Sequence, residues 1–107
     1  METQDAIAAL AALAHETRLD VFRLLVRAGA SGLAAGAIAE ALGVPSATMS
    51  FHLKELRNAG VVSSRRDGRS LIYRADFAAM NELLRFLGEN CCQGAAVIPS
   101  NAGKRRR

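Results

Sequence analysis

Two cysteines lie side by side near the end of this 107-residue chain, at Cys91 and Cys92. Small secreted domains use spaced cysteines as a disulfide framework, and an adjacent pair does not provide one. A helix is expected to end just before the pair, so both thiols would lie where a helix frays. We therefore expect a chemical role for the two thiols and not a structural one.

A second group of chemistry-bearing residues lies off the apolar stripe of segment 45–59. Short hydroxyls near its start can approach base edges and phosphates, and lysine and arginine further along can neutralise phosphate charge. Phe51 could contact thymine methyl groups or could pack against neighbouring elements, and His52 could lie at the core edge or contact a phosphate. The predicted DNA contacts of this segment are Ser46, Thr48, Ser50, Phe51, His52, Lys54 and Arg57.

A third group is the basic sequence SRRDGRS at positions 64–70. Folding alone gains nothing from crowding three arginines around a turn, because like charges repel. A phosphate backbone or a minor groove nearby would make the same charges attractive, with strong salt dependence. We predict DNA contacts from Arg65, Arg66 and Arg69, and a solvated charged turn is the alternative.

Hydrophobic periodicity predicts the elements that must position these groups. Apolar residues at helical spacing predict helices over 3–14, 16–28, 34–42, 45–59 and from Phe77 to about Asn90. The third and fourth helices are separated by a turn of about three residues that contains Gly43, which is the helix-turn-helix signature. Segments 61–66 and 69–75 predict two strands of a hairpin, with Asp67-Gly68 as its two-residue turn.

These elements predict a mainly α fold with a β-hairpin wing, a winged helix-turn-helix of five helices and two strands. At 107 residues, half of them apolar, the chain fits one domain over 1–90, followed by the cysteine pair and a basic tail over 91–107. The net charge of +4 favours a polyanionic partner. The sequence has neither a long apolar run nor a positively charged start, so we expect a cytoplasmic protein without a membrane partner.

The sequence offers no set of residues for catalysis. Its two histidines, His15 and His52, stand at no catalytic or metal-ligand spacing with a nucleophile or carboxylate. We therefore predict that the chain is not an enzyme and needs no obligatory cofactor.

Three motifs, in this order, resemble the ArsR/SmtB family of metal-sensing repressors. They are LAHETRL at 13–19, VPSATMSFHLKEL at 44–56, and GVV at 60–62 followed by RDGR at 66–69. The resemblance covers roughly residues 8–87. It implies a homodimer built from the first and last helices, which represses transcription by occupying a palindromic operator that inducer binding vacates.

The family uses different ligand sets for different inducers, and two of them are missing here. The arsenite pattern places cysteines before the recognition helix, where this chain has Ala34, Gly36 and Ala39. The zinc pattern needs histidines along the last helix, and none lies between Asp76 and Asn90. What remains is the cysteine pair, which resembles that of an arsenical-responsive subgroup and implies trivalent arsenic bound at Cys91 and Cys92.

The number of thiols leaves several inducers open. Inorganic arsenite favours three thiolates, whereas a methylated or aryl arsenical needs two, and a third ligand could come from the other subunit or from solvent. Antimonite sensing, a thiol redox switch and two inert cysteines are the alternatives. A non-inducible structural DNA-binding protein is the alternative of another class.

Overall fold

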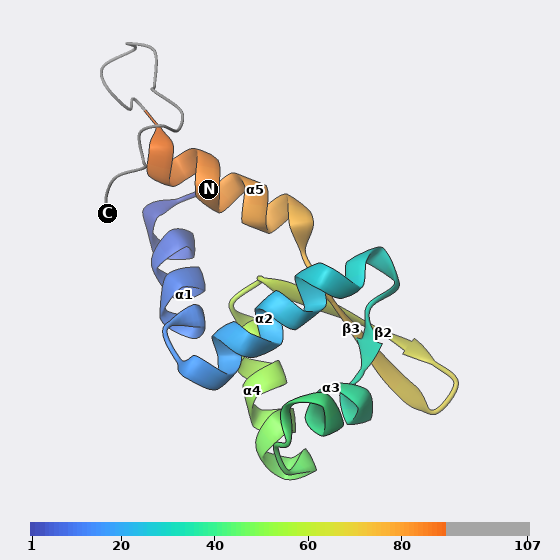
Figure 1. Ribbon diagram of the computed structural model, residues 1–107. Helices are drawn as coiled ribbons and strands as arrows, with labels where there is room; N and C mark the ends of the chain where they lie inside the picture. The colour runs from blue at the N-terminus through green and yellow to red at the C-terminus, as the bar shows by residue number, and fades with distance from the viewer. Residues whose placement is uncertain (90–107) are drawn as a thin grey trace, which may run out of the picture.

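The computed structural model describes residues 1–89, which form five α-helices, a short 3₁₀ helix and one small sheet (Figure 1). The elements in chain order are α1 (Thr3–Leu13), α2 (Glu16–Ala28), η1 (Gly29–Ser31), β1 (Leu33–Ala34), α3 (Ala35–Leu42), α4 (Ser46–Asn58), β2 (Val62–Asp67), β3 (Ser70–Ala75) and α5 (Phe77–Gly88). The five predicted helices are all present, and their ends agree with the prediction within two residues. The cysteine pair and the basic tail lie outside the described residues.

The sheet has one strand more than predicted. Its order is β1-β3-β2, with both pairings antiparallel, and β1 pairs through Leu33 with Tyr73 and through Ala34 with Ile72. Two residues are too few to show a strand pattern in the sequence. They become a strand because Gly32, with φ of 71°, lets the chain turn closely against β3.

The hairpin turn was predicted one residue too early. Asp67 pairs with Ser70, so the turn consists of Gly68 and Arg69, and the prediction of Asp67-Gly68 was wrong. Gly68 has φ of 66° and occupies the first turn position, where a positive φ is needed. The strands therefore continue through Asp67 on one side and begin at Ser70 on the other.

The core is built around α2, which runs through the middle of the molecule (Figure 1). Its fully buried Val21 and Leu25 belong to one cluster with the inner faces of the helix-turn-helix and the sheet. The largest fully buried side chains are Leu25, Ile38, Met49, Leu53, Leu56 and Val21. One continuous core thus holds α3, α4 and the hairpin in fixed positions.

The helices α1 and α5 lie at the other end of the molecule from α3 (Figure 1), and α1 also contacts α4. The buried face of α1 consists of Ala6, Ala9 and Ala12, while the larger Ile7 is 59% exposed. On α5 only Leu83 is buried, and Leu84 and Leu87 face outward. In the described part of the chain, none of the helices has the length and apolar character to cross a membrane.

Candidate nucleic-acid interface

A short turn fixes α4 relative to α3. Gly43 ends α3 in the left-handed conformation, and its N–H donates to the carbonyl groups of Ala39 and Glu40. The N–H of Val44 also donates to the Ala39 carbonyl, over 3.0 Å. Pro45 is the N-cap of α4 and not a residue of its first turn, and its carbonyl accepts from the Met49 N–H over 2.8 Å. These bonds hold the start of α4 in one orientation.

The inner stripe of α4 anchors the helix in the core. Met49 is 1% exposed, and Leu53 and Leu56 are fully buried. Truncating one such side chain to alanine costs about 2–5 kcal/mol in typical cores. The helix therefore cannot rotate to present another face, and its opposite face is held toward solvent.

Nine of the ten predicted DNA-contacting side chains are exposed, and the tenth is His52. The exposed residues are Ser46, Thr48, Ser50, Phe51, Lys54, Arg57, Arg65, Arg66 and Arg69. Residues of α4 and of the hairpin thus supply hydroxyl, phenyl and cationic groups to the surface, as direct readout and phosphate contact require.

Phe51 is 54% exposed, so the alternative that it packs into the hairpin or α3 does not hold. The guanidinium carbon of Arg18 lies 5.5 Å from the centre of the Phe51 ring, within the range of a cation–π contact. The rings of Phe51 and His52 also meet edge to face at 5.8 Å. Phe51 is therefore a surface residue whose ring is in contact with Arg18 and His52.

His52 is 7% exposed, and its burial supports the core-edge role over the phosphate contact. Its Nδ1 accepts a hydrogen bond from Nε of Arg18 over 3.2 Å, and its ring lies 4.8 Å from that of His15. Burial lowers the pKa of His52 below its ordinary value of 6.5, and the nearby charges of His15 and Arg18 lower it further. The ring is neutral at pH 7, as a hydrogen-bond acceptor at Nδ1 must be.

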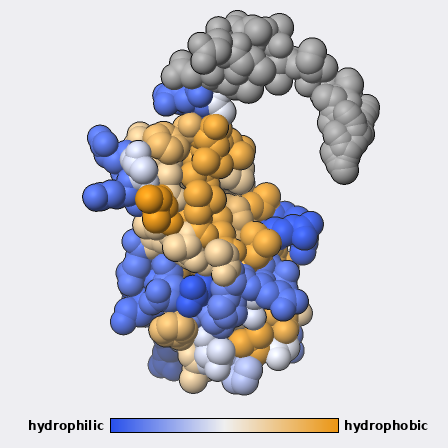
Figure 2. Space-filling view, turned by 90° about the vertical axis from the view of Figure 1, so that its left-hand side faces the viewer, coloured by the Kyte–Doolittle hydropathy of each residue, from blue (hydrophilic) through white to orange (hydrophobic). Residues whose placement is uncertain are grey.

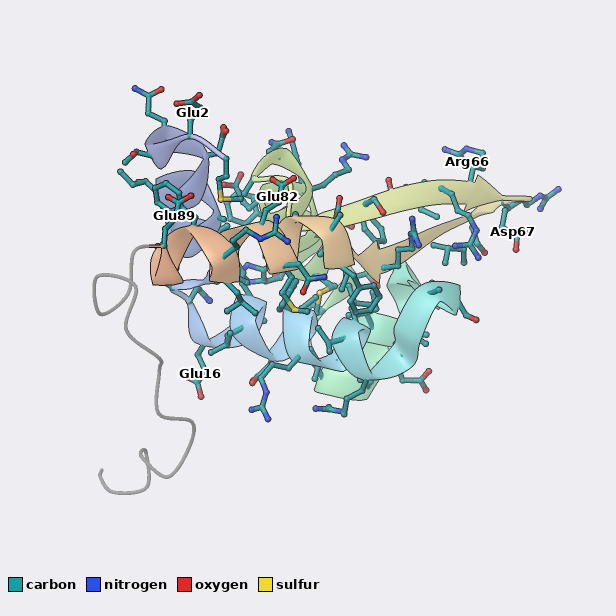
Figure 3. All side chains as sticks on the ribbon, turned by 90° about the horizontal axis from the view of Figure 1, so that it is seen from above. Glu2, Glu16, Arg66, Asp67, Glu82 and Glu89 are labelled. Carbon is teal, nitrogen blue, oxygen red and sulfur yellow. The ribbon has the colours of Figure 1, made fainter. Side chains whose placement is uncertain are left out.

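The hairpin projects from the body of the molecule, and Figure 3 shows Arg66 and Asp67 near its far end. Closer to its base, Arg65 donates to the Ser31 carbonyl over 3.2 Å. Arg57, at the end of α4, donates to Oγ of Ser64 over 3.4 Å. The second bond joins the last turn of α4 to the hairpin, so the two predicted DNA-contacting surfaces are connected.

Sequence reasoning did not single out Arg18, although this side chain contacts two residues of α4. In the sequence Arg18 belongs to the polar face of an amphipathic helix and resembles any solvated arginine. The only available signal was its place in the LAHETRL motif, which says nothing about the partner.

The positions that the arsenite pattern would use lie in β1 and α3. Ala34, Gly36 and Ala39 have no side chain that could bind a metal. Within residues 1–89, no group of three or more histidine, cysteine, aspartate or glutamate side chains could hold a metal ion. The predicted ligands Cys91 and Cys92 lie outside the described residues.

Comparisons with known proteins agree with this architecture. A family described as a helix-turn-helix domain matches residues 13–65. The HTH-type transcriptional regulator YgaV of Escherichia coli K12 is 29% identical over 89 residues, which are 83% of this chain and 88% of YgaV.

Two solved structures are similar over most of their length. An ArsR-like transcriptional regulator from Rhodococcus sp. RHA1 has a TM-score of 0.73 and 30% identity, and the match covers 84% of this chain and 82% of that one. The homodimeric winged helix-turn-helix DNA-binding domain of Mb0332 from Mycobacterium bovis has a TM-score of 0.65 and 28% identity, covering 89% and 88%.

Proposed function

This chain belongs to the ArsR-like family of winged helix-turn-helix transcriptional regulators, and we propose that it is a dimeric repressor released from its operator by a trivalent arsenical. Helix α4 would lie in the major groove, and the hairpin of β2 and β3, the wing, would contact the adjacent backbone or minor groove. Such a regulator acts on DNA in the cytoplasm.

The observation that carries the DNA contact is the exposed face of α4 joined to the basic wing. The hydroxyls of Ser46, Thr48 and Ser50 are all exposed near the start of α4, where recognition helices approach bases. Arg57 connects this helix to the wing through Ser64. Such a rigid surface favours DNA binding, because a flexible surface would lose conformational entropy when it becomes ordered on DNA, and this loss lowers affinity.

The outward faces of α1 and α5 support a homodimer. Large apolar side chains at the end of the molecule formed by these helices are solvent-exposed, and Figure 2 shows apolar surface gathered there. They are Met1 (40%), Ile7 (59%), Leu10 (43%), Leu84 (60%) and Leu87 (56%). A contiguous exposed apolar patch is typical of an interface, and the similar Mb0332 domain is homodimeric. A twofold dimer would present two α4 helices about one DNA turn apart, which suits a palindromic operator.

The adjacent thiols Cys91 and Cys92 support the arsenical as inducer. In the sequence, Glu89 and Asn90 separate them from Gly88, the last residue of α5. Thiolates are the soft ligands that arsenic(III) prefers, and two of them match the free valences of a methylated or aryl arsenical. Binding at the end of α5 would act on the dimer contact and so on the angle between the two α4 helices.

The experiment is a titration of the protein–DNA complex, read by fluorescence anisotropy. An operator is first selected from random duplexes, and the complex is then titrated with methylarsenite, arsenite, antimonite and peroxide. We expect methylarsenite to release the DNA at the lowest concentration. Release by peroxide alone would favour the thiol redox switch, and no release by any of the four would leave a DNA-binding protein without this inducer.

Cysteine variants test the site itself. Cys91→Ser and Cys92→Ser should each bind the operator as tightly as the unchanged chain but no longer respond to the arsenical, because one thiol cannot chelate arsenic. Ser100→Ala, in the same segment, is the control and should respond normally. A normal response of either cysteine variant would contradict the proposed site.

A further inference from the structure

Arg18 of α2 contacts two neighbouring residues of α4 that differ in burial. Its Nε donates to Nδ1 of His52, which is 7% exposed, over 3.2 Å. Its guanidinium carbon lies 5.5 Å from the ring centre of Phe51, which is 54% exposed. One half-buried side chain thus connects the core side of α4 with its outer face.

We propose that Arg18 is a positioning residue for DNA recognition. Through its hydrogen bond to His52 and its cation–π contact with Phe51, Arg18 holds the exposed Phe51 ring in the orientation that contacts DNA. This inference rests on the proposed function of α4 as the helix that contacts bases. An exposed phenyl ring otherwise samples several rotamers and loses that freedom when it binds. A planar guanidinium fixed by a hydrogen bond at Nε restricts the ring before DNA arrives.

The surroundings of His52 support this arrangement. His15 caps α2, since its Nδ1 accepts from the Thr17 N–H over 3.2 Å, and its ring lies 4.8 Å from that of His52. Glu55 of α4 shares with Arg18 the wall of a cavity of about 300 Å³, and α1 contributes only Ala8, Ala11 and Ala12 to that wall. The charges of His15 and Arg18 thus act on His52, and Glu55 lines the same cavity as Arg18.

The hydrogen bond exists only while Nδ1 of His52 carries no proton. Protonation removes the acceptor and places a positive charge beside the guanidinium, so Arg18 must move. Because burial and the charges of His15 and Arg18 lower the pKa of His52, this protonation requires a pH below 6.5. The added positive charge on His52 by itself strengthens DNA binding. Loss of the contact between Arg18 and Phe51 weakens DNA binding, so the two effects have opposite signs.

The first test compares Arg18→Lys with Arg23→Lys, an exposed arginine of the same helix. Lysine keeps the charge but lacks the planar donor, so Arg18→Lys should bind the selected operator roughly tenfold more weakly and Arg23→Lys as before. Replacing thymine by uracil, which lacks the methyl group, at each operator position should cost the unchanged chain affinity at one or more positions. Arg18→Lys and Phe51→Ala should lose that sensitivity together.

The second test is the pH profile of DNA binding between about pH 7.5 and 5.5, where histidines titrate. Relative to the His52→Gln variant, the unchanged chain should lose affinity several-fold at the acidic end. His52→Gln keeps an acceptor oxygen and does not titrate, so its profile should be flatter. Circular dichroism at both pH values checks that each variant stays folded, and the pH comparison does not depend on whether Arg18→Lys folds.

The outcomes separate the two proposals. If Phe51→Ala weakens binding but Arg18→Lys matches Arg23→Lys in affinity and in uracil sensitivity, the positioning role of Arg18 is overturned and α4 remains the reading helix. If Phe51→Ala, Ser46→Ala, Thr48→Ala and Ser50→Ala all bind normally, the proposed function of α4 itself fails. A pH profile of the unchanged chain that matches that of His52→Gln would also overturn the positioning role.

Discussion

The arginines predicted to contact DNA differ in how the protein holds them. Arg57 and Arg65 donate to Ser64 and to the Ser31 carbonyl, so their positions are set by the protein before DNA binds. Arg66 and Arg69 are exposed at the end of the wing, on either side of Asp67 and Gly68. The anchored pair is suited to fixing the register of the protein on the duplex, and the residues at the tip are suited to backbone or minor-groove contact.

Removing a charge at the tip should therefore weaken DNA binding without unfolding the protein. We expect Arg66→Ala and Arg69→Ala each to lower affinity and to reduce the slope of log K against log salt by about 1, since each contact releases counterions. Fluorescence anisotropy at several salt concentrations measures both quantities. Arg23→Ala, on α2, should leave the slope unchanged. If Arg66→Ala and Arg69→Ala also have the slope of the unchanged chain, the wing does not contact DNA.

Among the elements, the two-residue strand β1 contributes more than its length suggests. It pairs with Tyr73 and Ile72, at the base of the wing, and leads directly into α3. It therefore connects the helix-turn-helix with the sheet. The turn at Gly32 makes this pairing feasible, because a Cβ there would overlap the carbonyl oxygen of Tyr73.

Gly32→Ala should lower the free energy of unfolding by about 1–3 kcal/mol, the usual range for overpacking a close contact. The positive φ of 71° adds strain for any residue with a side chain. Urea denaturation monitored by circular dichroism measures the change. Gly36→Ala is the matched control, because a Cβ at this exposed helical position meets no atom within 4 Å, and it should be neutral or stabilising. Equal stability of the two variants would show that the β1 turn tolerates a side chain.

At the scale of the whole molecule, apolar and basic surfaces lie at different ends. Exposed leucine and isoleucine side chains are concentrated on α1 and α5 (Figures 1 and 2), while the cationic groups predicted to contact DNA lie on α4 and the wing. Because one end is suited to a second copy and the other to DNA, a change in the proposed dimer contact would alter the spacing of the two α4 helices.

A charge placed in the apolar end should therefore separate the proposed dimer. Leu84→Glu changes a side chain that is 60% exposed, so folding should be little affected while the apolar contact is lost. We expect a shift toward monomer in analytical ultracentrifugation and at least a tenfold loss of affinity for a palindromic operator. Leu19→Glu, a 44% exposed leucine on α2, is the control. A dimer that persists in Leu84→Glu, or an unchanged chain that is monomeric, would contradict this interface.

Local patterns in the sequence were enough for the helices, the helix-turn-helix and the wing. The stripe of Met49, Leu53 and Leu56 and the helix stop at Gly43 each lie within one segment, so their periodicity and turn chemistry could be recognised without the fold. The same stripe predicted which side of α4 faces solvent, and the exposed hydroxyls and cations confirm that side. The resemblance to ArsR/SmtB repressors then correctly indicated the family.

Only the tertiary structure decided how those elements are tied together. The bonds from Arg18 to His52 and from Arg65 to Ser31 each span 34 residues, and β1 exists only because β3 is there to pair with it. Contacts between distant segments leave no local periodicity, and His52 could be placed at either the core edge or the phosphate from the sequence alone. The sequence therefore determined which face of α4 is exposed and proposed to contact DNA, and the packing of α2 against α4 determined how that face is held.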